Sequence, residues 1–176
     1  LQQQGNLDEA VRAYRKAVEI YPDFYEFHNS LGQALCLQGQ LDESVSCLQR
    51  AIELDSESAL PYQNLWEALA RQGRVDEGIE CLRRAIELNP GEGDLYLKLA
   101  EALQGKNELT KAVGYYRKAI QLKPDLHWPY YKMGTALSAQ GQLHEAIECY
   151  RKAIELEPAS AITYHYLGYT LSLINR

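Results

Sequence analysis

The stretch QGNLDEAVRAYRKAVEIYP, residues 4–22, decides the fold because close copies of it recur along the chain. Its glycine, Gly5, recurs after 34, 34 and 68 residues, and a fifth copy carries asparagine at the same place. Glycine and asparagine are the residues that most readily take the left-handed conformation that ends a helix. The other copies are QGQLDESVSCLQRAIELDS (38–56), QGRVDEGIECLRRAIELNP (72–90), KNELTKAVGYYRKAIQLKP (106–124) and QGQLHEAIECYRKAIELEP (140–158).

Each 34-residue copy is predicted to hold two helices. Apolar residues spaced three and four apart, such as Leu41, Val45 and Leu48, give each helix one buried face. A glycine or asparagine ends the first helix, and in most copies a proline after the second helix prevents its continuation. The predicted helices lie near 7–20 and at 25–38, 41–54, 59–72, 75–88, 93–105, 109–122, 127–140, 143–156 and 161–174, and no strand pattern competes.

Composition narrows the class of protein. Of the 176 residues, 46% are apolar, which is typical of a soluble folded chain. The net charge is −6, from 18 basic and 24 acidic residues, and this opposes nucleic acid as a partner because phosphate contact needs a basic face. No run of about 18 apolar residues predicts a membrane span, and no signal peptide is recognisable.

One copy carries a complete family signature. It reads Tyr130, Met133, Gly134, Leu137, Ala146, Tyr150, Ala153 and Pro158. The chain therefore resembles tetratricopeptide repeat (TPR) proteins over essentially its whole length. It is similar to bacterial multi-TPR proteins and, more loosely, to the repeat arrays of O-GlcNAc transferases. The resemblance implies an all-α, right-handed superhelical solenoid of 34-residue helix-turn-helix units, whose first helices line the concave face.

The repeat register divides the chain into six segments. They are a second helix (1–24), four full repeats (25–58, 59–92, 93–126 and 127–160) and a further first helix (161–176). The stretch GEGDLY, residues 91–96, falls short of a phosphate-binding glycine motif and is expected to be a flexible joint. The first and last segments each lack a partner helix, so we expect a fragment of a longer array and the possibility of self-association through these ends.

The sequence shows no catalytic motif. The four histidines form no metal-binding pair at the usual spacing, and His28 stands in a column of aromatic residues, which favours a place beside the core. Cys47, Cys81 and Cys149 share one column, too far apart for disulfides, and are expected to be buried thiols in a reducing compartment, the cytoplasm. We therefore expect no enzyme activity, no metal and no cofactor.

What remains is a binding surface on the exposed side of the first helices. The predicted partner-binding residues are Asn29, Gln33, Gln63, Glu67, Arg71, Leu97, Glu101, Trp128, Tyr131, Thr135, His165 and Tyr169. Its first half is polar and mildly acidic, and its last part is rich in aromatic residues, as binding hot spots are. The alternative is that missing repeats or a following domain cover the aromatic cluster.

These features favour a non-catalytic scaffold that binds a protein or peptide on its concave face. The main alternative is a regulatory or substrate-recruiting region of a larger enzyme, for example a glycosyltransferase-like protein, whose catalytic domain lies outside this segment. The columns that hold chaperone carboxylates in related domains lack the required lysines and asparagines here, so that mode of binding is not expected.

Trp66 stands where the other copies have a small residue. Its column reads Gly32, Trp66, Ala100, Gly134 and Gly168, and the column predicted to face it reads Ala10, Ser44, Gly78, Ala112 and Ala146. The copy that enlarges one side therefore shrinks the other. We expect Gly78 to make room for the indole, although glycine inside a helix costs about 1 kcal/mol relative to alanine.

Overall fold

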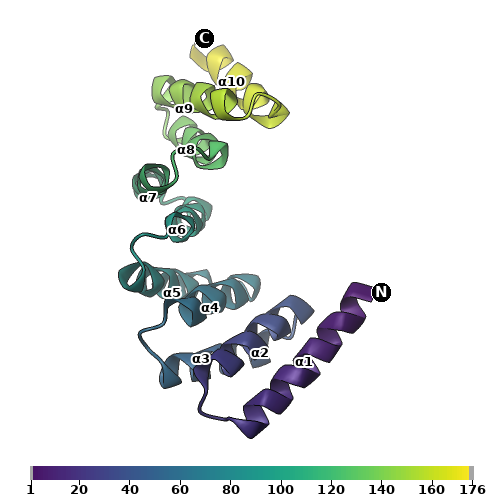
Figure 1. Ribbon diagram of the computed structural model, residues 1–176. Coiled ribbons are helices and arrows are strands. Elements are labelled where there is room, and N and C mark those ends of the chain that lie inside the picture. Colours follow the sequence, from purple (N-terminus) through teal and green to yellow (C-terminus); the bar gives the residue numbers. More distant parts are fainter. Residues whose placement is uncertain (1, 175–176) are drawn as a thin grey trace. The chain divides into compact units, whose positions relative to one another are not determined.

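The computed structural model describes residues 2–174, with side chains from residue 6 onward, and its secondary structure over that range is helical (Figure 1). The helices are α1 (Gln2–Ile20), α2 (Tyr25–Gln38), α3 (Leu41–Leu54), α4 (Ala59–Arg71), α5 (Val75–Leu88), α6 (Gly93–Gly105), α7 (Leu109–Leu122), α8 (His127–Ala139), α9 (Leu143–Leu156) and α10 (Ala161–Ile174). The predicted all-α repeat fold is confirmed, and every boundary except the start of α1 agrees within one residue. The last two residues of the predicted final segment lie outside the described residues.

The first helices end at residues that tolerate a positive φ. These residues are Gly39 (φ 83°), Gly73 (78°), Gly141 (78°) and Asn107 (63°). After Gly39, the backbone N–H of Gln40 donates to the carbonyl oxygen of Leu35 at 2.9 Å, and the equivalent bond closes the other three turns. The predicted turns are therefore confirmed, including the one where asparagine replaces glycine.

Gly5 is the exception among the repeat glycines. The sequence pattern predicts that it ends a helix and that the next helix begins near residue 7, but α1 runs through it from Gln2. The glycine is compatible with the helical conformation too.

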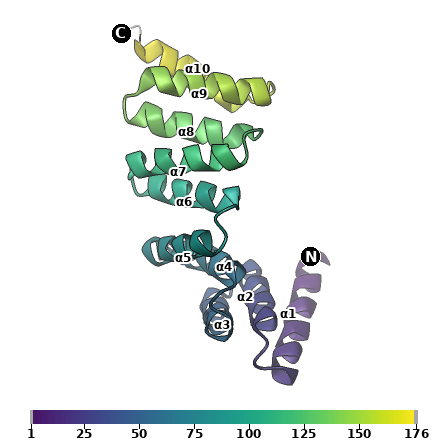
Figure 2. The ribbon, with the colours of Figure 1, turned by 60° about the vertical axis from the view of Figure 1, so that its left-hand side comes forward.

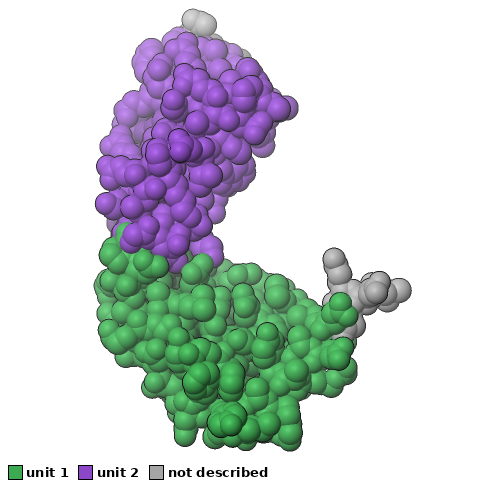
Figure 3. Space-filling model, in the orientation of Figure 1, with its two compact units in different colours: residues 1–90 green, residues 91–176 purple. Residues whose placement is uncertain are grey.

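The chain forms two compact units, residues 1–90 with α1–α5 and residues 91–176 with α6–α10 (Figure 3). The division falls at the start of the GEGDLY stretch. Within each unit consecutive helices pack in chain order, as Figure 2 shows for α6 to α10. The first helices also pack directly on one another, α2 on α4 and α6 on α8 on α10, so they form one continuous face of each unit.

The core of each unit is built from equivalent positions of successive second helices. One column has no exposed surface and consists of Leu48, Leu82, Tyr116 and Tyr150. A second column is at most 2% exposed and consists of Ala51, Ala85, Ala119 and Ala153. Small alanines let the paired helices approach closely, and the large column fills the space between them at the density of a protein interior.

The predicted contact between Trp66 and Gly78 is confirmed. A Cβ atom at Gly78 would lie only 2.5 Å from Cε3 of the Trp66 ring and 3.0 Å from Cζ3. Gly78 is buried, and the indole occupies the space of the side chain that stands at the equivalent positions Ala112 and Ala146. Trp66 therefore acts as a packing residue between α4 and α5.

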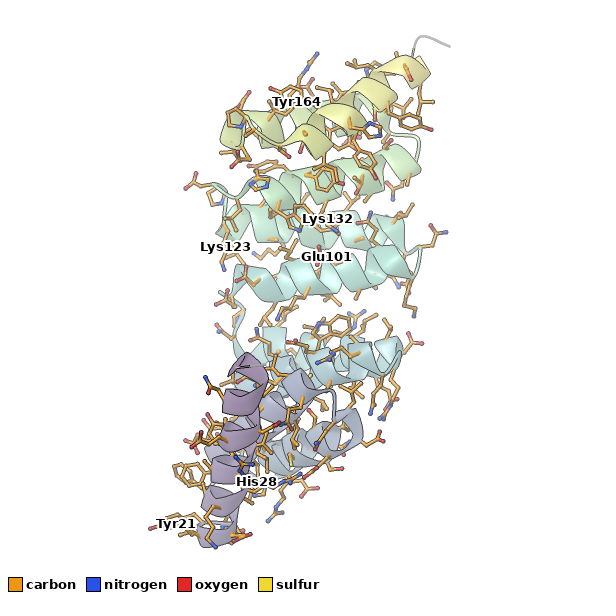
Figure 4. All side chains as sticks on the ribbon, turned by 90° about the vertical axis from the view of Figure 1, so that its right-hand side faces the viewer. Tyr21, His28, Glu101, Lys123, Lys132 and Tyr164 are labelled. Atoms are coloured by element: carbon orange, nitrogen blue, oxygen red, sulfur yellow. The ribbon has the colours of Figure 1, made fainter. Side chains whose placement is uncertain are left out.

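His28 lies beside the core, as its column predicts. Its side chain is buried, and its Nε2 lies 2.7 Å from the carbonyl oxygen of Pro22, to which the ring donates a hydrogen bond. The imidazole thus ties α2 to the turn that follows α1 (His28 is labelled in Figure 4).

The four cysteines, Cys36, Cys47, Cys81 and Cys149, are free thiols. Burial raises the pKa of Cys47, Cys81 and Cys149 to about 11 in each case, with nearby glutamates adding to the effect. The reactive thiolate is therefore scarce at neutral pH. These side chains serve as small apolar residues of the second helices.

Candidate functional site

The predicted binding residues fall into two groups because the chain has two compact units. Residues 1–90 carry Asn29, Gln33, Gln63, Glu67 and Arg71, and residues 91–176 carry Leu97, Glu101, Trp128, Tyr131, Thr135, His165 and Tyr169. All of them lie on first helices. Each group is therefore a separate candidate surface.

The surface of the first unit is polar. Asn64 Nδ2 donates to Asn29 Oδ1 at 2.8 Å, and both amides are buried. Arg71 Nη1 donates to the carbonyl oxygen of Cys36 and so links α4 to the end of α2. Gln33 and Glu67 remain exposed at a small cleft of about 30 Å³, while Gln63 is half-buried.

The surface of the second unit centres on Trp128. Its Nε1 donates to Glu101 Oε1 at 3.3 Å, and Lys132 Nζ lies 3.3 Å from the same carboxylate oxygen. The Lys132 ammonium also lies over the Trp128 ring, 4.8 Å from its centroid, a cation–π distance. Glu101 on α6 and Lys132 on α8 lie on neighbouring helices (Figure 4), and together they hold the indole at its N–H and over its ring.

Tyr131 forms the buried base of this surface. Only 6% of the residue is exposed, and its ring lies 5.1 Å from Trp128 and 5.6 Å from Tyr166, centroid to centroid. Burial, with the adjacent Tyr166 hydroxyl, raises the pKa of Tyr131 to about 12. The phenol therefore stays protonated at neutral pH and supports its neighbours by packing.

The structure corrects the expected accessibility of Asn29 and Tyr131, because both side chains are buried. The physical reason is that each is covered by a side chain 35 residues later, on the first helix of the next repeat. Asn64 contacts and covers Asn29, and Tyr166 contacts and covers Tyr131. His165 is exposed.

Residues that contact the predicted set but are absent from it include Asn64, Lys132 and Tyr166. They occupy one column of the repeat, next to the column that contains Asn29, Tyr131 and His165. The 35-residue offset between polar or aromatic partners is the sequence signal that would have found Asn64 and Tyr166. Lys132 pairs instead with Glu101, 31 residues earlier.

The exposed part of the second surface is aromatic. Trp128 is 39% exposed and Tyr169 is 56% exposed, and the His165 ring lies edge-on to Tyr166 with centroids 5.6 Å apart. We call Trp128, His165, Tyr166 and Tyr169 the aromatic surface. Trp128 connects to His165 through the successive ring contacts of Tyr131 and Tyr166.

The remaining predicted residues frame the aromatic surface without extending it. Leu97 and Thr135 are half-buried. The Thr135 hydroxyl accepts a hydrogen bond from Gln104 Nε2 at 3.1 Å and donates to the carbonyl oxygen of Lys132 at 2.7 Å. Gln104 in turn accepts from the buried Tyr116 hydroxyl at 2.7 Å. This chain of bonds orders α6 and α8 beside the rings.

Within the described residues, no three His, Cys, Asp or Glu side chains come together in a way that could hold a metal ion. No helix between residues 2 and 174 combines the length and apolarity that a bilayer crossing requires.

The sequence matches known repeat families. A TPR repeat family matches residues 1–36, 32–73 and 135–173, and two tetratricopeptide repeat families match residues 66–127 and 115–148. Together these matches extend from residue 1 to residue 173. No curated protein matches the chain as a relative.

Solved structures give the same result for the fold. A crystal structure of MamA is 31% identical, with a TM-score of 0.84, over 91% of this chain and 94% of that one. YrrB, described as a TPR protein with an unusual peptide-binding site, is 22% identical, with a TM-score of 0.83, over 94% of this chain and 86% of that one. A MamA from Desulfovibrio magneticus RS-1 is 18% identical, with a TM-score of 0.80, over 86% of this chain and 85% of that one.

Proposed function

Because the chain belongs to the tetratricopeptide repeat family, we propose that it is a non-catalytic interaction scaffold that binds a peptide segment of a partner protein on its first helices. The aromatic surface is the main contact. YrrB is described as having a peptide-binding site, but at 22% identity its likeness concerns the fold, so the proposal rests on this chain's own side chains.

The observation that carries the proposal is the combination of exposed rings with a rigid base. Trp128 is fixed by Glu101 and Lys132, and the buried Tyr131 supports it from below. An exposed aromatic ring that is already ordered loses little conformational freedom when a ligand binds. Tryptophan and tyrosine in such settings are the residue types that dominate binding energy.

The chemistry of the surface suggests the ligand. The exposed parts of the Trp128 and Tyr169 side chains favour an apolar or aromatic side chain of the ligand, because contact removes apolar area from water. Exposed polar groups such as His165 can pair with the peptide backbone. The four free cysteines fit a reducing compartment such as the cytoplasm.

The test is selection of binders from a displayed library of random peptides, followed by affinity measurement on variants. We expect Trp128→Ala and Tyr169→Ala each to weaken binding about tenfold, the range of a hot-spot residue. Circular dichroism should show the same helical content in each variant, because Trp128 and Tyr169 are 39% and 56% exposed and neither belongs to the buried core.

A matched control is Tyr164→Ala. Tyr164 is 51% exposed on the same helix as Tyr169, but five residues away it points about 140° around the helix axis. The control should bind selected peptides as the unchanged chain does. Failure to select any peptide, or equal losses in Tyr164→Ala and Tyr169→Ala, would contradict the proposal.

A further inference from the structure

Two helices, α1 and α10, expose residues at positions that every complete repeat buries. In the four helix pairs α2–α3, α4–α5, α6–α7 and α8–α9, a large residue of the second helix packs against the first helix. A Cβ atom built at Gly134 would lie 2.7 Å from Tyr150 Cε1, and one at Gly32 would lie 2.6 Å from Leu48 Cγ. A small residue of the first helix facing a large residue of the second is thus the contact that joins the two helices in α2–α3 and in α8–α9.

On α1 the large residue of this contact is Tyr14. Its four equivalents, Leu48, Leu82, Tyr116 and Tyr150, are fully buried, whereas Tyr14 is 37% exposed. The neighbouring Ala17 is also partly exposed, although its equivalents are buried. This face of α1 therefore carries the side chains with which a second helix packs against a first helix.

On α10 the small residue of the contact is Gly168. A Cβ atom there would meet no atom within 4 Å, in contrast to Gly32 and Gly134. Leu171 is 39% exposed, while its equivalents in the four complete repeats are at most 3% exposed. Beside it, Ile147 of α9 and Ile174 of α10 line a hollow of about 390 Å³ with Leu171.

Oppositely charged residues on α1 and α9 are a second, independent sign that the two surfaces are complementary. Arg15 Nη2 of α1 lies 2.7 Å from Glu43 Oε2 of α3, and Arg117 of α7 makes the equivalent 3.2 Å pair with Glu145 of α9. Arg151, at the rim of the hollow, is the repeat equivalent of Arg15 and Arg117. Glu9, exposed on α1, is the repeat equivalent of Glu43 and Glu145.

We propose that α1 of one copy of this chain docks on α9 and α10 of a second copy and completes a repeat between the two molecules. Tyr14 then packs on Gly168 as Tyr150 packs on Gly134, and Glu9 pairs with Arg151 as Glu145 pairs with Arg117. The contact is heterologous, so each added copy presents the same two surfaces again and association continues beyond the dimer. It does not depend on peptide binding by the aromatic surface.

Sedimentation velocity of the 176-residue chain over a range of concentrations tests this contact. We expect the average mass to rise with concentration, and Gly168→Leu to weaken association at least about tenfold by filling the site of Tyr14. The substitution meets open space in the single chain, so its melting temperature should not fall. The matched control is Gly114→Leu, an exposed helical glycine on α7 that also has no atom within 4 Å of an added Cβ, and it should leave association unchanged.

The ion pair supplies a reversal test. Arg151→Glu and Glu9→Arg should each weaken association by about two- to fivefold, as expected for an exposed pair, and the two variants mixed in equal amounts, or combined in one chain, should recover it. A chain that remains monomeric at about 0.5 mM, where even weak specific contacts are populated, overturns the proposal. Association that responds equally to Gly168→Leu and Gly114→Leu, or no recovery by the charge reversal, also overturns it, because the contact then lies elsewhere.

Discussion

Replacing Tyr150 with alanine is expected to lower the free energy of unfolding by about 3–5 kcal/mol, the range for removing a buried aromatic ring. Tyr150 is fully buried, and its ring packs on Gly134 and near Tyr131 and Tyr166. The substitution leaves a cavity whose walls cannot collapse, because Gly134 offers no side chain to fill it. Chemical denaturation followed by circular dichroism measures the loss.

Two controls separate the ring from its hydroxyl and from its size. Tyr150→Phe keeps the ring and should cost no more than about 1.5 kcal/mol. Tyr150→Leu copies the first full repeat, where Leu48 faces Gly32, and should fall between phenylalanine and alanine. A loss below about 1 kcal/mol for Tyr150→Ala would show that this column does not hold the helices together.

Gly78→Ala is expected to destabilise the chain by about 1–3 kcal/mol, although alanine is the better helix former. The new Cβ would lie 2.5 Å from Cε3 of Trp66, and that atom belongs to a rigid ring rather than to the end of a flexible chain. Overpacking therefore outweighs the gain in helix propensity. Thermal and chemical denaturation measure the difference.

A double-mutant cycle identifies the cause. In a Trp66→Ala background the ring is gone, so Gly78→Ala should become stabilising by up to about 1 kcal/mol. Gly114→Ala, which meets open space on α7, should be stabilising by a similar amount in the unchanged chain. If Gly78→Ala stabilised the chain as Gly114→Ala does, the volume compensation between Trp66 and Gly78 would be refuted.

The sequence predicts the helices well because each repeat carries the same local signals. Asn107 has the positive φ that glycine has at the equivalent positions of other repeats, and the facing columns of Trp66 and Gly78 are apparent from the 34-residue register alone. Gly5 shows the limit of this reasoning. A glycine permits a turn without requiring one, and α1 continues through Gly5 as a helix.

The candidate site was less predictable because its geometry depends on side chains from successive repeats. Helical periodicity places Asn29 and Tyr131 on the exposed side of their own helices. It does not predict that the side chains of Asn64 and Tyr166, from the next first helix, extend over them. Lys132 illustrates the same point, since its role depends on Glu101 one repeat earlier. The exposure of a side chain in a solenoid thus depends on the neighbouring repeat as well as on its own.

The chain's two tryptophans offer the most direct test of where a partner binds, because one packs against Gly78 and the other lies on the aromatic surface. In a ¹H–¹⁵N spectrum each indole N–H gives one resonance, and Trp66→Phe and Trp128→Phe assign them. On titration with a selected peptide, we expect the Trp128 resonance to shift and the Trp66 resonance to stay in place. A saturating peptide that shifts Trp66 and leaves Trp128 unchanged would contradict binding at the aromatic surface.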